Sequence, residues 1–177
     1  MKEMTFSTEY EKTLSSTIEN ISSTIDVKIV QMYPDVSIPF YATDGSAGCD
    51  VRAYLTNENG YPNGKICIKT GETIAIPTGL KFQLPKGYEM QIRPRSGLSL
   101  KTKLRIGNSP GTLDSDFTGQ LMIIIDNISI NQDAIIDHND RIAQLVFAPV
   151  TKAIFNFVSE LNKTERGEGG FGSTGTR

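Results

Sequence analysis

Residues 73–92 read TIAIPTGLKFQLPKGYEMQI, and this stretch carries the pattern that decides the fold. Three short runs, 73–76, 81–84 and 89–92, are separated by Pro77-Thr78-Gly79 and Pro85-Lys86-Gly87. Short apolar runs bounded by Gly and Pro are typical of β-strands joined by tight turns. Further strands are predicted at Val27–Val30, Ile66–Ile68, Gln120–Ile125, Ala134–Ile136 and Ile142–Phe147. Many short strands at close intervals predict an all-β sandwich or barrel.

The two ends of the chain differ from this pattern. Apolar residues near the N-terminus are spaced four, four, four, three and four apart, at Phe6, Tyr10, Leu14, Ile18, Ile21 and Ile25. This spacing predicts an amphipathic helical appendage over residues 1–25, marginal in stability unless it docks on the domain or on a protein partner. Residues 26–165 form the predicted β domain. Residues 166–177 contain five of the chain's 16 glycines and are predicted to be a mobile tail.

The charge balance limits the classes of partner. The 177 residues include 18 Lys and Arg against 20 Asp and Glu, a net charge of −2, which argues against a nucleic-acid or acidic-membrane surface. The longest apolar run, 121–125, is too short to span a bilayer, and the N-terminus lacks a secretory signal pattern. We therefore expect a soluble cytoplasmic protein.

Two cysteines and one histidine are too few to predict a His/Cys zinc site. Cys49 and Cys67 are expected to be free thiols, with a single disulfide as the alternative. His138 lies in a polar run and is predicted to be a solvated turn residue.

Five segments carry residues that strands and turns alone do not require. Ala47-Gly48-Cys49-Asp50 places a carboxylate at the start of a strand, where the alternative is a turn aspartate bonded to its own backbone. Arg93 to Leu98 combines the planar donors of Arg95, the Ser96 hydroxyl and the bare backbone of Gly97, a set suited to a phosphate. The alternative for this second segment is an ordinary surface loop.

The third segment, 107–119, is predicted to be a glycine-bracketed hairpin whose exposed main-chain groups can read a base edge. Asp114 can hold and deprotonate a water there, and the alternative for Asp114 and Asp116 is solvation with capping of a turn. The fourth, 140–144, enters an apolar strand, where the Gln144 amide needs either a phosphate or a neighbouring carbonyl as partner.

The fifth segment, 166–175, is glycine-rich and contains one cation and one aromatic ring. Such a backbone can form an anion-binding nest, Arg166 supplies positive charge, and Phe171 can stack on a planar base. A low-complexity linker is the alternative.

These five segments, in this order, resemble the five motifs of the homotrimeric deoxyuridine triphosphatases (dUTPases), and the resemblance runs from about Asp26 to Arg177. It implies a jelly-roll-like β fold and an enzyme that hydrolyses dUTP to dUMP and diphosphate, with Mg²⁺ chelated by the three phosphates. That activity keeps uracil out of DNA and supplies dUMP for thymidylate synthesis. The resemblance also implies a homotrimer with substrate bound at the subunit interfaces.

The resemblance implies roles at the phosphate end of the substrate. The phosphate-binding residues it indicates are Arg95, Ser96, Gly97 and Gln144. Asp50 is expected to hold Mg²⁺ in its outer shell through water. The tail residues expected to close over uracil and the terminal phosphate are Arg166, Phe171, Gly172 and Ser173.

At the nucleoside end, the resemblance indicates a catalytic aspartate and a base-reading hairpin. Asp114 is expected to orient and activate the attacking water. Asn108 and main-chain groups near Thr112 and Leu113 are expected to read the pyrimidine, with Met122 beside them. A tight hairpin excludes the methyl group of dTTP, and the wrong donors and acceptors exclude dCTP.

Two positions depart from the family pattern. The family usually has Tyr where this chain has Phe117, and the ring alone is expected to keep the selectivity for deoxyribose. Asn139 stands where glycine is common, and Asn also tolerates a left-handed turn. Two other classes compete with this interpretation: a dCTP deaminase of similar fold, and a regulatory protein that keeps the pocket as a ligand-controlled switch. The intact hairpin with Asp114 argues against the deaminase.

Overall fold

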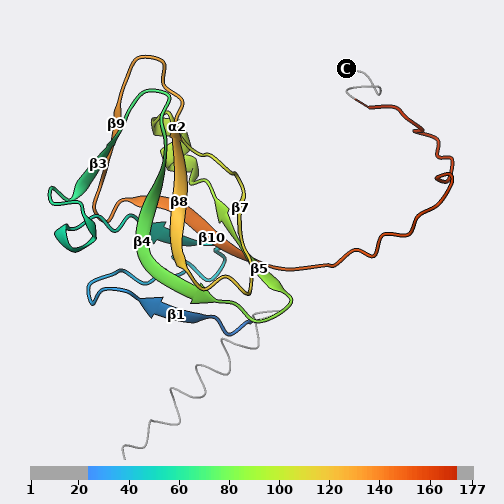
Figure 1. The fold of residues 1–177 in the computed structure, drawn as a ribbon, viewed down its shortest axis with the longest axis horizontal. Coiled ribbons are helices and arrows are strands. Elements are labelled where there is room, and N and C mark those ends of the chain that lie inside the picture. The colour runs from blue at the N-terminus through green and yellow to red at the C-terminus, as the bar shows by residue number, and fades with distance from the viewer. Residues whose placement is uncertain (1–23, 171–177) are drawn as a thin grey trace, which may run out of the picture.

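Two four-stranded antiparallel sheets enclose one apolar core in the computed structural model, which describes residues 24–170 (Figure 1). The first sheet has the order β1-β4-β8-β6, with β1 (Lys28–Gln31), β4 (Thr73–Gln83), β8 (Gln120–Asn127) and β6 (Leu104–Ile106). The second has the order β2-β10-β5-β7, with β2 (Cys49–Arg52), β10 (Arg141–Pro149), β5 (Tyr88–Arg93) and β7 (Gly111–Leu113). The predicted all-β, jelly-roll-like fold is confirmed.

A two-stranded ribbon and two short helices complete the described fold. The ribbon pairs β3 (Lys65–Ile68) with β9 (Ala134–Asp137) and lies at one end of the sheets (Figure 1). The 3₁₀-helix η1 (Asn57–Asn59) lies just before the ribbon in sequence, and the α-helix α2 (Ser96–Lys101) follows β5.

Alternation of apolar and polar residues explains how the strands build the core. In β8 the side chains of Leu121, Ile123 and Ile125 are buried, while the residues between them face outward. A strand whose side chains alternate between two faces can cover a core with one face and present the other to solvent or a partner. The site described below occupies the outward face of the second sheet.

Pro77-Thr78-Gly79 does not end a strand as predicted, because β4 continues through it with a register shift against β8. The buried Thr78 hydroxyl donates to the Leu121 carbonyl at 2.8 Å, which holds this irregular step to the neighbouring strand. Gly79 has a φ of +68°, and a Cβ there would lie 2.7 Å from a methyl group of Val36. The Pro–Gly signal therefore marks a bend within one long strand.

The prediction for His138 was right about the turn but wrong about solvation. His138 is half-buried, and its Nδ1 accepts the main-chain N–H of the buried Leu55 at 3.1 Å. Its ring packs edge-on against Tyr54. The expectation for the cysteines is confirmed, since Cys49 is buried, Cys67 is exposed and both are free thiols.

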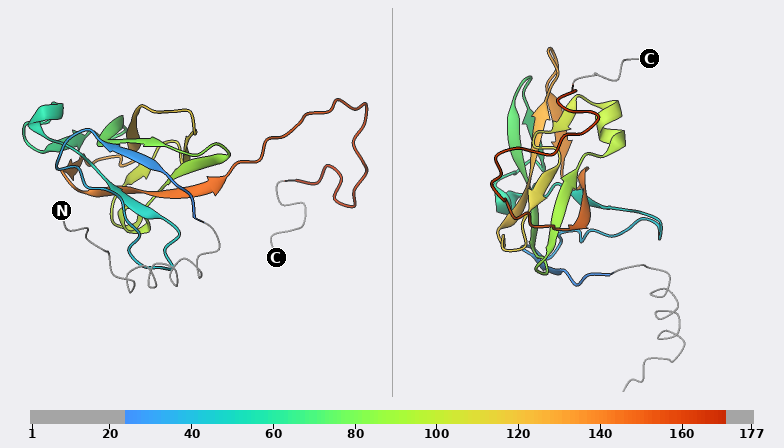
Figure 2. Two further views of the ribbon diagram at one scale, coloured as in Figure 1. Left: turned by 90° about the horizontal axis from the view of Figure 1, so that it is seen from below. Right: turned by 90° about the vertical axis from the view of Figure 1, so that its right-hand side faces the viewer.

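The chain leaves the second sheet at Pro149, before the domain boundary expected at residue 165. Residues 151–168 are all exposed and extend away from both sheets as an arm (Figure 2). The N-terminal apolar stripe from Phe6 to Ile21 lies outside the described residues, as do Phe171, Gly172 and Ser173.

Candidate active site

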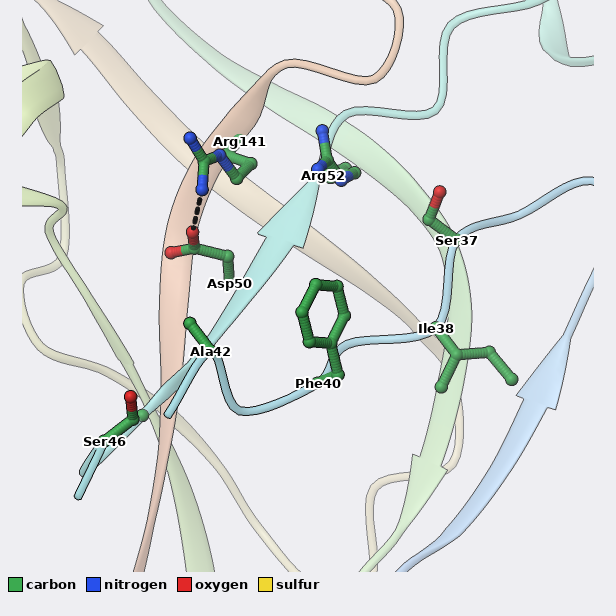
Figure 3. Close-up of a pocket in the computed structure, with 9 residues that line it drawn as sticks. Ser37, Ile38, Phe40, Ala42, Ser46, Asp50, Arg52 and Arg141 are labelled. Carbon is green, nitrogen blue, oxygen red and sulfur yellow. Dashed lines mark hydrogen bonds and ion pairs between the residues drawn. The ribbon is translucent and has the colours of Figure 1, made fainter. Parts of the chain in front are cut away.

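A carboxylate held by two guanidinium groups lies on the outward face of the second sheet. Asp50 in β2 accepts a hydrogen bond from Arg95 Nε at 2.7 Å on Oδ1. It accepts a second from Arg141 Nη1 at 3.1 Å on Oδ2, which Figure 3 shows. Arg95 Nη1 also donates to the main-chain carbonyl of Arg141 at 3.2 Å. We call these three residues the Asp50 cluster. The Asp50 carboxylate bonds to arginines rather than to its own backbone, so the turn-aspartate alternative is wrong.

The surroundings of the Asp50 cluster are positively charged. Arg52 lies opposite Arg141 in the β2–β10 register and lines the same hollow as Asp50 and Phe40 (Figure 3). Two guanidinium groups therefore bond the Asp50 carboxylate and a third lies in the same hollow, although the whole chain has a net charge of −2. A local excess of positive charge of this kind suits a polyanionic ligand.

A β-bulge in β10 brings two polar side chains to this outward face. The register against β2 shifts between Arg141 and Ala143, so both Ile142 and Ala143 point into the core. Residues three apart on a regular strand face opposite ways, but the extra residue places Arg141 and Gln144 on one face. Bulges commonly redirect side chains next to active sites in this manner.

Gln144 connects β10 to the segment that carries Arg95. Its Nε2 donates one N–H to the Pro94 carbonyl at 2.8 Å, so a neighbouring carbonyl is one partner of the amide and its second N–H is left for a ligand. A second hollow beside it brings together parts of the second, third and fourth segments, being lined by Gln91, Arg93, Pro94, Ser96, Ser109, Pro110 and Gln144.

Ser96 and Gly97 open the helix α2, so the segment is not the ordinary surface loop that was the alternative for it. Both residues are exposed, and a Cβ at Gly97 would meet nothing within 4 Å. The protein's own packing therefore does not require glycine at this position, and open space lies above it.

The third segment is more complex than the predicted hairpin. β6 and β8 pair with each other, but β7 between them crosses to the second sheet and pairs with β5. Asn108 folds against Gly111, where an added Cβ would lie 3.1 Å from Asn108 Nδ2. Thr112 is exposed and Leu113 is buried, so main-chain groups rather than the Leu113 side chain remain for a ligand.

Asp114 and Phe117 follow β7 in a turn in which the Phe117 N–H donates to the Asp114 carbonyl at 3.2 Å. The Asp114 side chain is exposed, Phe117 is 47% exposed, and Met122 on β8 is 40% exposed. The two hollows described above include neither Asp114 nor Phe117 in their linings. Of the third segment, only Ser109 and Pro110 line a hollow together with the phosphate-type residues.

Arg166 is an exposed residue of the arm, which extends away from both sheets (Figure 2). Its Nε donates to the Gly169 carbonyl at 2.8 Å, within the arm itself. A single chain therefore does not bring the described part of the fifth segment to the other four.

Sequence reasoning missed Arg141 and Arg52 as members of the site. The available signals were their positions, with Arg52 two residues after Asp50 on the same strand face and Arg141 just before Gln144. Cys49, beside Asp50, is not a candidate nucleophile, because burial raises the pKa of its thiol and keeps it protonated.

Comparison with known proteins decides the family. Residues 35–175 match the dUTPase family. The chain belongs to the dUTPase family. A deoxyuridine 5'-triphosphate nucleotidohydrolase from Bdellovibrio bacteriovorus is 48% identical over 138 residues, covering 78% of this chain and 87% of that protein. The corresponding protein from Fusobacterium nucleatum is 45% identical over 151 residues, covering 85% of this chain and 97% of that protein.

Solved structures agree with the family assignment. A mutant dUTPase of Staphylococcus bacteriophage 80alpha, solved with dUpNHpp, is 25% identical to this dUTPase-family chain with a TM-score of 0.72, covering 86% of this chain and 99% of that one. The dUTPase of phage phi11 is 21% identical with a TM-score of 0.66 and shares the fold. Among residues 24–170, no helix is long and apolar enough to cross a membrane.

Proposed function

We propose that this chain hydrolyses dUTP to dUMP and diphosphate in the cytoplasm. The observation that carries the proposal is the family match over most of the chain, together with the motif residues of the Asp50 cluster on one sheet face. Relatives 45–48% identical are named deoxyuridine 5'-triphosphate nucleotidohydrolases.

Arg95, Ser96, Gly97 and Gln144 bind the phosphates in this proposal. Arg95 donates one N–H to Asp50 and another to the Arg141 main-chain carbonyl. A guanidinium has five N–H donors, so three remain for phosphate oxygens. Planar guanidinium donors suit phosphate oxygens in charge and geometry. The positive surroundings of the site offset the charge of a triphosphate without requiring a basic protein.

Asp114 orients the attacking water and accepts its proton, since it is an exposed carboxylate on the base-reading segment. Asn108 and the main chain of Thr112 and Leu113 read uracil, with Met122 nearby, and the Phe117 ring packs under deoxyribose. A site built to pair the uracil edge rejects cytosine, because its buried groups would be left without partners.

Magnesium fits this site as an ion held mainly by the substrate. Among residues 24–170, no three His, Cys, Asp or Glu side chains gather as a ligand cluster. Each Asp50 oxygen accepts one guanidinium bond and retains a further lone pair, which can take a metal-bound water. When bound, Mg²⁺ neutralises phosphate charge and orients the triphosphate. Asp50 supplies an outer-shell acceptor for it.

The active unit is proposed to be a homotrimer with shared sites. Four large apolar side chains of the arm, Ile154, Phe155, Phe157 and Leu161, are each more than 85% exposed in a single chain. Contiguous exposed apolar side chains of this size mark a contact with another molecule. A second copy is proposed to supply Asp114 and Phe117, because in one chain neither residue lines the hollows beside Arg141 and Gln144. A ring of heterologous contacts closes such an assembly.

The end of the arm and the tail beyond it are proposed to close over bound substrate, with Arg166 on phosphate and Phe171 over uracil, followed by Gly172 and Ser173. Truncation after Lys163 is expected to leave folding and the trimer intact and to reduce turnover by orders of magnitude, because such a lid excludes water and completes the phosphate site. Undiminished turnover of the truncated protein would show that the tail is only a linker.

The test of the proposed function is a substrate panel. The purified protein is incubated with Mg²⁺ and dUTP, dCTP, dTTP or UTP, while diphosphate and ammonia are measured. Rapid diphosphate release from dUTP alone is the expected result. Ammonia release from dCTP would instead indicate a deaminase, and equal rates on dUTP and dTTP would contradict the steric reading of the hairpin.

A further inference from the structure

Arg141 is linked to Arg95 in two ways, through the Asp50 carboxylate and through its own main-chain carbonyl. Its guanidinium bonds Asp50 Oδ2 at 3.1 Å, and Asp50 Oδ1 holds Arg95 Nε at 2.7 Å. Its main-chain carbonyl accepts Arg95 Nη1 at 3.2 Å. Two neighbouring N–H groups of one planar guanidinium are thereby fixed, which sets both the direction and the plane of Arg95.

The placement of Arg141 opposes local stability, which points to a functional reason for it. Arg141 and Arg52 are opposite each other in the β2–β10 register, and like charges in that arrangement are unfavourable. Arg52 is turned to the Asn139 carbonyl, to which its Nη1 donates at 2.6 Å. Arg141 is turned to Asp50, and the bulge after it is what allows it to share a face with Gln144.

We infer that Arg141 is a positioning residue of the phosphate site, acting on Arg95 through Asp50 and through its own carbonyl. The inference deepens the proposed function and rests on it. The side chain of Arg95 is only 23% exposed, whereas that of Arg141 is 51% exposed. Arg95 is therefore confined where it would meet the ligand, and Arg141 supports it from the solvent side. A long flexible side chain binds phosphate better when its donors are already oriented, since less conformational freedom is lost on binding.

The test compares Arg141→Gln with a matched control, Arg105→Gln. Arg105 is an arginine of the first sheet whose Nη1 is held by the Thr102 and Leu104 carbonyls, so its loss removes the same charge far from Asp50. Affinity for dUpNHpp and for dUMP is measured by calorimetry, first without Mg²⁺. The Arg95 Nε–H signal is followed by NMR in the ligand-free protein.

Arg141→Gln is expected to weaken dUpNHpp binding by about tenfold, which corresponds to about 1.4 kcal/mol. It should also raise KM by a similar factor and broaden the Arg95 Nε–H signal, while Arg105→Gln leaves all three unchanged. Arg141→Lys keeps the charge and the main-chain carbonyl and should recover part of the affinity. Because the side chain of Arg141 acts through Asp50, Asp50→Asn combined with Arg141→Gln should bind no more weakly than Asp50→Asn alone.

An unchanged Arg95 signal in Arg141→Gln, with dUpNHpp affinity within twofold of the parent protein, would overturn the inference. Equal losses in Arg141→Gln and Arg105→Gln would also overturn it, because they would reflect only the general charge of the protein. The Arg95 signal needs no substrate, so it decides the positioning role separately. A parent protein that fails to hydrolyse dUTP would instead refute the proposed function.

Discussion

Replacing Asp114 with Asn separates the proposed chemistry from binding and folding. The Asp114 side chain is exposed, and the hydrogen bond that holds its turn runs from the Phe117 N–H to the Asp114 main-chain carbonyl, which Asn retains. The free energy of unfolding should therefore change by less than about 0.5 kcal/mol, as for other surface substitutions. The amide keeps the shape of the carboxylate but cannot accept a proton from water.

The expected loss in turnover follows from the value of a general base. Such groups contribute about 10²- to 10⁴-fold, or about 2.7 to 5.4 kcal/mol of activation free energy at about 1.36 kcal/mol per tenfold. Diphosphate release from dUTP measures the rate, and dUpNHpp affinity, which should be largely unchanged, measures binding. Asp116→Asn is the matched control, because Asp116 is an exposed aspartate of the same turn.

Two results would refute this reasoning. If Asp114→Asn kept more than about a tenth of the parent rate, the barrier would have risen by less than about 1.4 kcal/mol and another base would be responsible. If Asp116→Asn lost as much turnover as Asp114→Asn, the loss would reflect the charge of the turn rather than one proton acceptor.

Three further substitutions probe the fold around the site. Gly119→Ala puts a Cβ 2.6 Å from Phe117 Cζ, so the ring must move, and KM for dUTP should rise by at least about tenfold with little change in Tm. His138→Ala leaves a buried main-chain N–H without its acceptor and should lower the free energy of unfolding by about 1–3 kcal/mol in urea titrations, with turnover unaffected. Burial and a hydrogen bond to a carboxylate raise the pKa of Tyr54 from 10.0 to about 12, so the unfolded chain ionises first and stability should fall as pH rises across that interval. Tyr54→Phe should remove that part of the decline, and an identical slope in both proteins would contradict the assignment.

Much of the fold could be predicted because strand patterns are local. The runs that became β5, β8 and β10 alternate or concentrate apolar residues in ways that only a sheet can bury. The left-handed conformation predicted as tolerable at Asn139 is present, with a φ of 67°. Predictions failed where a contact distant in sequence overrode a local signal. The Pro77–Gly79 turn signal is an example, because the Thr78 hydroxyl donates to a carbonyl 43 residues away and β4 continues through the turn residues.

The sequence by itself determined which residue types are available for phosphate and base recognition, and their order along the chain, because five short motifs carry them. Only the tertiary structure decided which of them meet. Asp50 and Arg141 are 91 residues apart in sequence, and they pair because β2 and β10 are neighbours and because a bulge rotates Arg141 to the outward face. Register and bulges depend on the packing of a whole sheet, so no local pattern could reveal that Arg95 would be held from two sides.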